Sequence, residues 1–336
     1  MTDVLHVSPA VSTKPFRSPV IVADARIMRS KRRLALLTIW IPTLGTALAV
    51  ALAVQFGLRG LDMALLIGMY TLTMMGLEVS FHRQLSHNAF DSPRWVRAAL
   101  AICGSMAMQG GVLYWVATHR RHHIHSDTPE DPHSPYYRLS SSGPQKLGWL
   151  QGLWHAQLGN MYTDHATNVT VFAKDMLKDP VIGAINRRYW HCVALGLLIP
   201  TVIGGLADMS LYGALTGLLW GGLVRIFLVH HVYFANGSFS HMYGGKPFDN
   251  GDCSANNMWF GLPTFGSAYQ NNHHAFPTSA LIGFKWWQPD IGHMFIRAFE
   301  CVGLASNVKR ATPQQIAAKQ AQSTTASNHP NTGDRS

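Results

Sequence analysis

The sequence predicts an all-α integral membrane protein, with four transmembrane helices in two hairpins and a cytoplasmic helical cap that carries a histidine-rich site. Three observations favour this fold class. Of the 336 residues, 47% are hydrophobic and only 13% are charged, whereas a soluble domain has about 25% charged residues. The chain contains apolar runs long enough to cross a bilayer, and most of its 18 histidines are clustered near the ends of those runs.

Four apolar runs set the expected spans. An α-helix rises about 1.5 Å per residue, so about 20 apolar residues cross a hydrocarbon core of roughly 30 Å. Short links within each pair predict two hairpins. A further apolar stretch, residues 96–115, is interrupted by glycines, and we expect an interfacial or half-buried helix there rather than a fifth span. The expected spans are residues 34–57, 63–81, 189–206 and 211–229.

Basic residues indicate the orientation. Lys31, Arg32 and Arg33 precede the first span, and Arg187 and Arg188 precede the third. The positive-inside rule therefore places both termini and the central section in the cytoplasm. The net charge of +10 could indicate nucleic-acid binding, but the basic residues flank apolar segments, so we expect no nucleic-acid partner.

The chain divides into three parts. Residues 1–33 are expected to form a cytoplasmic N-terminal segment, and residues 34–311 the membrane domain. Residues 312–336 are rich in Gln, Ala, Ser and Thr, a composition typical of disordered segments. We therefore expect a disordered polar tail.

Histidine spacing predicts a metal site. On a helix, positions i, i+3 and i+4 lie on one face, so His119, His122 and His123 of "HRRHHIHSD" can face one centre. Imidazole suits iron, zinc, copper or nickel, and its second nitrogen needs an acceptor that fixes the tautomer. Glu78, Asp127 and Asp131 lie close enough in sequence to be such acceptors. The other clustered histidines are His82, His87, His241, His273 and His274.

Eight imidazoles exceed the needs of one tetrahedral zinc ion. They suit two metal ions, each with nitrogen ligands and an open position. Redox-active iron is the favoured metal, because a site at the membrane surface is next to lipid chains, and these offer only C–H bonds for reaction. Isolated histidines are more often surface or core residues, and we interpret His6, His191, His293 and His329 in that way.

The order of motifs "HRQLSH", "HRRHHIHSDTPEDPHSP", a later lone His241 and "QNNHHAFP" resembles the membrane fatty-acyl desaturase family, specifically the acyl-CoA delta-9 type in its bacterial form. The similarity extends over about residues 60–310 and includes "KPFDNGD" and "GLASNVK". The resemblance implies a non-haem di-iron centre of two iron ions, with O2 as co-substrate, that introduces a C=C bond into an acyl chain. It also implies the metal ligands His82, His87, His119, His122, His123, His241, His273 and His274.

The resemblance further implies an acyl thioester or another aliphatic substrate and a location in the bacterial inner membrane. Two electrons per turnover would come from a separate donor of the ferredoxin or cytochrome b5 type with its reductase. A basic cytoplasmic face would suit such an acidic donor, or would anchor the protein to anionic lipid. Its expected members are Arg120, Arg121, Arg187 and Arg188.

Two departures from the family pattern lie near the metal site. The family has a "GEGWHNNHH"-like stretch where this chain has "GSAYQNNHH", so Gln270 stands at the position of a ninth histidine. The family also has an asparagine four residues before its lone histidine, where this chain has Gly237. A local bulge would bring Asn236 into its place. Gln270 and Asn236 are therefore candidate weak or water-mediated ligands.

These departures leave alternatives open. The substrate could be an ordinary acyl chain or a smaller, more polar molecule such as an amino-acid-derived secondary metabolite. A hydroxylase or ketolase could use the same scaffold, and product analysis separates it from a desaturase. A histidine-rich metal transporter is disfavoured, because transporters place polar ligands at the membrane midplane and these spans contain few ionisable residues.

Overall fold

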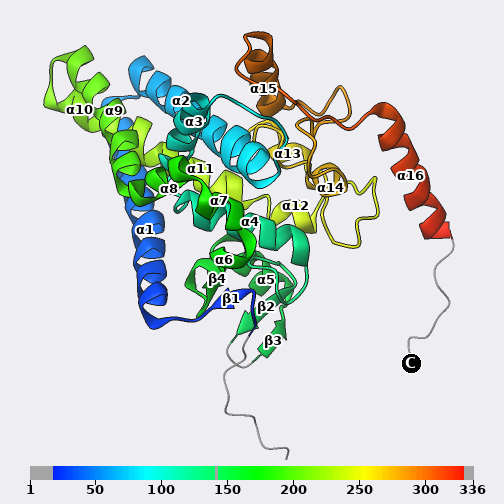
Figure 1. Cartoon of the computed structure of the whole chain (residues 1–336). Helices are drawn as coiled ribbons and strands as arrows, with labels where there is room; N and C mark the ends of the chain where they lie inside the picture. The colour runs from blue at the N-terminus through cyan, green and yellow to red at the C-terminus, as the bar shows by residue number, and fades with distance from the viewer. Residues whose placement is uncertain (1–17, 141–142, 329–336) are drawn as a thin grey trace, which may run out of the picture.

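A computed structural model describes residues 18–140 and 143–328 of the protein. Within them, four helices are long and apolar enough to cross a membrane, and they form two hairpins (Figure 1). The predicted fold class is confirmed. The first span is α1 (Ala25–Phe56), and the second joins α2 (Gly60–Met75) to the π-helix η1 (Gly76–Ser86). The third is α9 (Tyr189–Asp208), and the fourth joins α10 (Leu211–Gly217), the π-helix η3 (Leu218–Val224), α11 (Arg225–Phe234) and α12 (Phe239–Met242).

The first helix begins nine residues before its expected apolar run. The Asp24 side chain caps it and accepts hydrogen bonds from the backbone N–H groups of Arg26 and Ile27, at 2.9 and 3.0 Å. Such a cap satisfies two of the donors that have no partner within the helix. The polar residues 25–33, expected in a separate segment, therefore extend the span as one helix. Residues 1–17 of that segment lie outside the described residues.

One arginine joins the links of the two hairpins. The Arg59 guanidinium donates to Asp62 at 2.7 Å and also contacts Asp208 and Thr216. Asp62 and Thr216 are buried, whereas the side chains of Arg59 and Asp208 are 28% and 29% exposed, so the charge of Arg59 is paired at the edge of the bundle. These contacts fix the two hairpins to each other at the end of the bundle away from the cap (Figure 1).

The cap consists of short helices and two small sheets. Residues 96–115 form most of a first cap helix and the start of a second, and neither is among the candidate spans of the described residues. The single half-buried helix expected there is instead divided between α3 (Arg94–Ser105) and α4 (Val112–His125), with a break at residues 106–111. The central section also contains α5 (Trp149–Gln157), the 3-10 helix η2 (Gly159–Tyr162), α6 (Val169–Phe172), α7 (Lys174–Lys178) and α8 (Pro180–Arg187). The C-terminal section contains α13 (Met258–Gly261), α14 (Gln270–Ala275), α15 (Ile291–Cys301) and α16 (Pro313–Asn328).

Both sheets are antiparallel pairs of short strands. One pairs β1 (Ile21–Val22) with β4 (Ala166–Thr167), which attaches the segment before the first span to the cap. The other is a hairpin of β2 (Tyr137–Ser140) and β3 (Gly143–Lys146).

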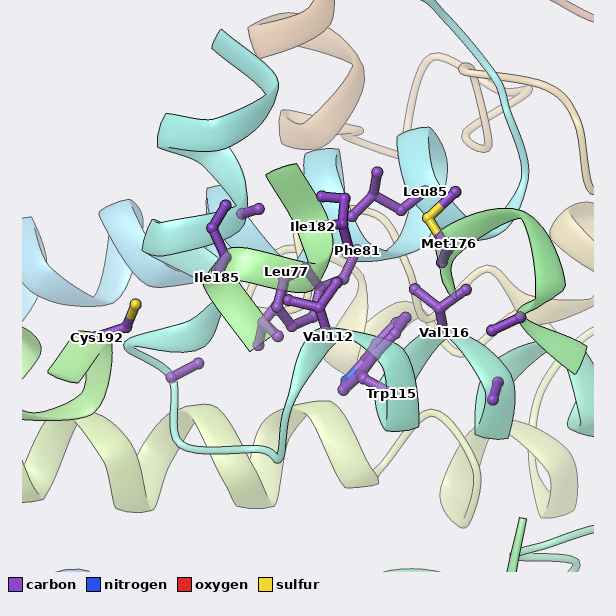
Figure 2. Packing of buried hydrophobic residues seen from close by; sticks show 14 of the residues in the cluster. Leu77, Phe81, Leu85, Val112, Trp115, Val116, Met176, Ile182, Ile185 and Cys192 are labelled. Atoms are coloured by element: carbon purple, nitrogen blue, oxygen red, sulfur yellow. The ribbon is translucent and has the colours of Figure 1, made fainter. Parts of the chain in front are cut away.

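A hydrophobic core joins the second span to the cap. Leu77 and Phe81 of η1 pack against Trp115 of α4 and Ile182 of α8 (Figure 2). The Phe81 and Trp115 rings meet edge to face, with centroids 5.6 Å apart. Each large buried side chain of this kind stabilises the fold by about 1.5–3 kcal/mol. The core therefore holds the second span and α4, which both carry clustered histidines, in a fixed relation.

Close backbone contact fixes α3 against the same span. A Cβ atom on Gly76 would lie 2.0 Å from the backbone nitrogen of Gly104. Only glycine permits this approach. The helix α3 is thus held directly against the second span.

The C-terminal tail differs from the prediction. Residues 313–328 form α16, which contradicts the expected disorder, while residues 329–336 lie outside the described residues. Thr312 and Gln315 form a capping box in which each backbone N–H donates to the other side chain, at 2.8 and 3.2 Å. Pro313 occupies the first helical position, where it is favoured. Lys319 then donates to the carbonyl of Ala275 at 2.7 Å, so the helix lies against α14.

Candidate metal centre

A π-helix places the first two histidines together. His82 and His87 are five residues apart, a separation that turns side chains about 140° apart on an α-helix. In a π-helix the hydrogen bonds join residues i and i+5, so such residues lie one turn apart. The segment Gly76–Ser86 is π-helical, His87 follows it directly as its C-terminal cap, and the two imidazole centroids are 5.1 Å apart.

Five imidazoles form the first cluster, and their Nε2 atoms face one another. The Nε2 of His273 lies 2.8 Å from that of His82 and 2.9 Å from that of His123. The Nε2 of His119 lies 2.8 Å from that of His87 and 3.1 Å from that of His123. Two nitrogens that bind one ion at about 2.1 Å and at right angles are about 3.0 Å apart. The donor set therefore fits an ion with five imidazole ligands.

Three imidazoles form the second cluster. The ligand atoms of His122, His241 and His274 lie within 4.8 Å of one another. Among the described residues, the buried Nε2 atoms of His241 and His274 have no hydrogen-bond partner. The two clusters adjoin, because the rings of His123 and His274 have centroids 4.4 Å apart. The geometry thus suits two neighbouring ions, the second with fewer imidazoles.

The helix α4 serves both clusters. His119 and His123 face the first cluster, whereas His122 faces the second. The three histidines that the spacing places on one face are therefore divided between two adjoining clusters. On an α-helix, position i+3 lies on one side of position i and position i+4 on the other, and i+4 is the closer of the two in angle. The side chain of His122 therefore points away from those of His119 and His123, towards the second cluster.

A carboxylate accepts a hydrogen bond from one histidine of the first cluster and from each of the second. Such a bond holds the proton on Nδ1 and leaves the Nε2 lone pair free for a metal. Sequence reasoning named three of the four carboxylates and missed Asp252, although it lies in the quoted "KPFDNGD" motif. The pairs are Glu78 with His82 at 3.0 Å, Asp131 with His122 at 3.0 Å, Asp127 with His241 at 2.8 Å and Asp252 with His274 at 2.6 Å.

Glu78 belongs to a larger buried network. It also accepts from Arg83 at 3.0 Å and from the Tyr233 hydroxyl at 3.2 Å, and Arg83 pairs with Asp290 at 2.7 Å. Arg83 and Glu78 are 1% and 0% exposed, so their charges are stable only as a pair. This network links the second span to α15 and fixes the orientation of His82.

Burial favours the neutral form of five of the eight imidazoles. Burial, followed by the charge of neighbouring imidazoles, lowers the pKa of His87, His119, His123 and His273 well below its usual value. Burial also lowers the pKa of His274 to about 4. A metal ligand must be deprotonated, so these five imidazoles are prepared for ligation at neutral pH.

Gln270 is the first residue of α14 and is buried. Its Nε2 donates to the backbone carbonyl of Ser267 at 2.8 Å. This bond orients the amide and leaves its carbonyl oxygen for another partner. Gln270 lines the same cavity as His122 and Asn236.

The backbone bulges at Asn236. A local bulge was the condition under which Asn236 would take the place of the family's asparagine. The helix α11 ends at Phe234, and the N–H of Ser240 donates to the carbonyl of Ala235, five residues back, at 3.0 Å. Asn236 is 7% exposed, and neither atom of its amide has a protein partner among the described residues.

His133 is a neighbour of the second cluster that sequence reasoning missed. Its ring centroid lies 4.4 Å from that of His122, and its backbone N–H donates to Asp131 at 3.0 Å. A Cβ atom on Gly237 would lie 2.8 Å from its Nδ1. The glycine therefore makes room for this imidazole. The "DPHSP" motif contained the residue, but spacing alone gave no reason to select it.

A cavity of about 160 Å³ reaches both clusters. Apolar side chains from α1, α4 and α11 line most of it, including Leu34, Trp115 and Phe234, and it meets the metal centre at His119 and His122. Its mostly apolar lining suits an aliphatic chain.

Two arginines expected on a basic docking face have other roles. Arg121 is 1% exposed and donates to the carbonyl of Glu130 at 2.7 Å. Arg120 pairs with Asp175 at 2.6 Å. Neither offers a free charge to a donor protein. Of the isolated histidines, His191 and His293 lie outside both clusters, and His6 and His329 lie outside the described residues.

Comparison with known proteins identifies the family. Residues 59–289 match the fatty acid desaturase family. The chain belongs to this family. It is 46% identical to a hex-5-enoyl-[acyl-carrier protein] acetylenase of Moorena producens (strain JHB) over 279 residues, which cover 83% of this chain and 86% of the relative. As a desaturase family member, the protein is an oxidoreductase.

Other relatives carry different printed substrates. An sn-1 stearoyl-lipid 9-desaturase of Anabaena variabilis is 37% identical over 72% of this chain and 81% of its own. An icosanoyl-CoA 5-desaturase of Limnanthes douglasii is 34% identical over 72% of this chain and 63% of its own. The names cover acyl chains on a carrier protein, a lipid and coenzyme A.

Proposed function

We propose that this protein uses O2 to introduce unsaturation into an acyl chain at a centre of two iron ions. The observation that carries the proposal is the pair of adjoining imidazole clusters where an apolar cavity ends. Membership of the desaturase family supports the reaction, and every relative named above acts on an acyl chain.

The substrate carrier we propose is an acyl carrier protein. The relative with 46% identity acts on an acyl chain held in that way, whereas the lipid and coenzyme A enzymes are 37% and 34% identical. A thioester on a carrier protein would present its chain to the cavity from outside the membrane.

The histidines would hold the two ions. His82, His87, His119, His123 and His273 would bind one, and His122, His241 and His274 the other. Iron at these positions would supply the redox chemistry that removes hydrogen from an unactivated C–H bond, with O2 as the oxidant. Glu78, Asp127, Asp131 and Asp252 would maintain the ligand tautomers.

Gln270 and Asn236 would complete the second site. The Gln270 amide is already oriented by Ser267, so its oxygen is available as a ligand. Asn236 has an amide with no protein partner among the described residues, which suits a contact through water. Oxygen in place of a ninth nitrogen would leave the two ions in unequal surroundings.

The cavity residues would position the chain. Trp115 stacks on the His119 ring at 5.2 Å between centroids, so one apolar wall begins next to the metal centre. A chain held there would present a particular pair of carbons to the clusters, and positioning of this kind sets which bond reacts. The apolar lining also excludes water from the site.

Electrons would come from a separate donor of the ferredoxin or cytochrome b5 type with its reductase. We also propose that the protein lies in a bacterial inner membrane, with its termini and metal site in the cytoplasm. The basic residues that precede the first and third spans support this orientation.

The test is turnover by protein purified without oxygen and loaded with iron. It would receive acyl chains on a carrier protein, on coenzyme A and on lipid, with a donor system and O2. A product that lacks two hydrogens, formed fastest from the carrier-protein substrate, supports the proposal. A product that contains oxygen from O2 would show a hydroxylase and contradict it.

A further inference from the structure

A groove lined by arginines lies at the start of the first span. Its lining includes Arg26, Arg29 and Arg33 of α1 and Arg187 at the end of α8. No aspartate or glutamate is part of the lining. Within residues 18–140 and 143–328, none of these four arginines forms an ion pair. We call it the arginine groove.

The arginine groove changes from charged to apolar along one face of α1. Arg26, Arg29 and Arg33 lie at positions i, i+3 and i+7, which share a face of a helix. The same face continues with Leu34 and Leu37, which also line the groove. The arginines come first along α1, and the leucines follow them into the part of the helix that is expected to lie in the membrane.

Aromatic residues complete the far wall. Tyr189 and Trp190 at the start of the third span line the groove opposite α1. Aromatic rings of this kind are enriched where headgroups meet hydrocarbon. The charged part of the groove is therefore placed at headgroup depth, and the apolar part at the depth of acyl chains.

We propose that the arginine groove binds an anionic phospholipid. Guanidinium groups bind phosphate oxygens in pairs of parallel hydrogen bonds, and four unpaired guanidiniums give a strong preference for a negative headgroup. Leu34, Leu37 and Trp190 would contact an acyl chain that descends along α1. This inference does not depend on the reaction proposed above.

The site adjoins the substrate cavity. Leu34 and Tyr114 line both the arginine groove and the cavity that reaches the metal centre. A bound lipid would therefore support one wall of the cavity.

The test compares two double variants of the full-length protein, in which arginines that are neighbours in the sequence are replaced. Arg33→Gln with Arg187→Gln removes two groove cations. Arg32→Gln with Arg188→Gln removes two exposed cations that immediately neighbour them in sequence but do not line the groove. Protein in neutral detergent would be titrated with phosphatidylglycerol or phosphatidylcholine, and bound lipid counted by native mass spectrometry. Iron content and circular dichroism would show that both variants fold.

The wild type and the Arg32/Arg188 variant are expected to bind phosphatidylglycerol saturably and in preference to phosphatidylcholine. The groove variant should bind it roughly 30-fold more weakly, since each cation contributes about 1 kcal/mol to such binding and about 1.4 kcal/mol is tenfold. Equal losses in both variants, or equal binding of the two lipids by the wild type, would overturn the proposal. Displacement of the lipid by an equal concentration of 4′-phosphopantetheine would also overturn it and assign the groove to a soluble phosphate carrier.

Discussion

At the scale of single residues, Gln270 stands where the family pattern has a histidine, and its substitution tests whether it is a metal ligand. Replacement of Gln270 by Ala removes the candidate oxygen ligand, and iron content should fall from about two ions per chain towards one, because the second cluster retains only three imidazoles. Gln270→His restores a nitrogen at that position and should retain both ions. Iron per chain after desalting measures the effect. Unchanged iron content in the Ala variant would show that Gln270 is not a ligand.

Gly237 makes a second prediction at this scale. In Gly237→Ala the new Cβ would lie 2.8 Å from His133 Nδ1, so the imidazole must move away from His122. We expect a destabilisation of about 1–3 kcal/mol, typical of overpacking, measured as a lower unfolding temperature. Gly245→Ala is the matched control, because nothing lies within 4 Å of its Cβ position. Equal stability of the two variants would contradict the packing described for His133.

Glu78 couples stability to the metal site. Glu78→Gln keeps the shape of the side chain but leaves Arg83 with only Asp290 as a charged partner. An amide oxygen accepts the hydrogen bond of His82 more weakly than a carboxylate does, and a change to the partner of a ligand histidine typically lowers metal affinity by about 10–100-fold. A chelator competition assay measures this change. Glu300→Gln, at an exposed ion pair with Arg310, should leave the affinity unchanged.

At the scale of elements, the amino-acid sequence predicted the spans well but not their internal geometry. Hydrophobic runs give the length of a helix, and they located all four. They do not show that residues 76–86 are π-helical, because a run that is buried on all sides has no apolar face from which to read a period. Yet that π-helix brings His82 and His87 together.

The C-terminal tail contains a helix-start signal that its overall composition does not reveal. Its Gln, Ala, Ser and Thr residues suggested disorder, whereas Thr312, Pro313 and Gln315 together form a helix start. Local capping chemistry was the better guide there. Similarly, Asp252 and His133 were present in quoted motifs, but loop residues approach a site through tertiary structure that spacing does not encode.

The capping box at the start of α16 gives a prediction for this helix. Thr312→Ala removes the side-chain acceptor of the Gln315 N–H, at a cost of about 1 kcal/mol. Hydrogen exchange within residues 313–328 should become faster, while exchange in the spans stays the same. Thr325→Ala, near the other end of the helix, is the control. Equal protection in both variants would contradict the assigned helix start.

At the scale of the whole molecule, the metal centre joins parts of the chain that are far apart in sequence. The second span, α4, α12 and α14 all contribute imidazoles. Iron should therefore stabilise the entire fold. A ligand at 100 times its dissociation constant stabilises a protein by about 2.7 kcal/mol, which corresponds to roughly 4 °C for a chain of this size. Thermal unfolding before and after chelation measures the shift, and no shift would contradict the assembly of the site from these segments.

The central claim is that two iron ions in these clusters desaturate an acyl chain, and one measurement tests it most directly. Protein purified without oxygen would be analysed for iron per chain and then given a carrier-bound acyl chain, a donor system and O2, with the product identified by mass. The account predicts about two irons per chain and a product lighter by two hydrogens. Full iron loading with a hydroxylated product, or turnover that is unaffected when the iron is removed, would contradict it.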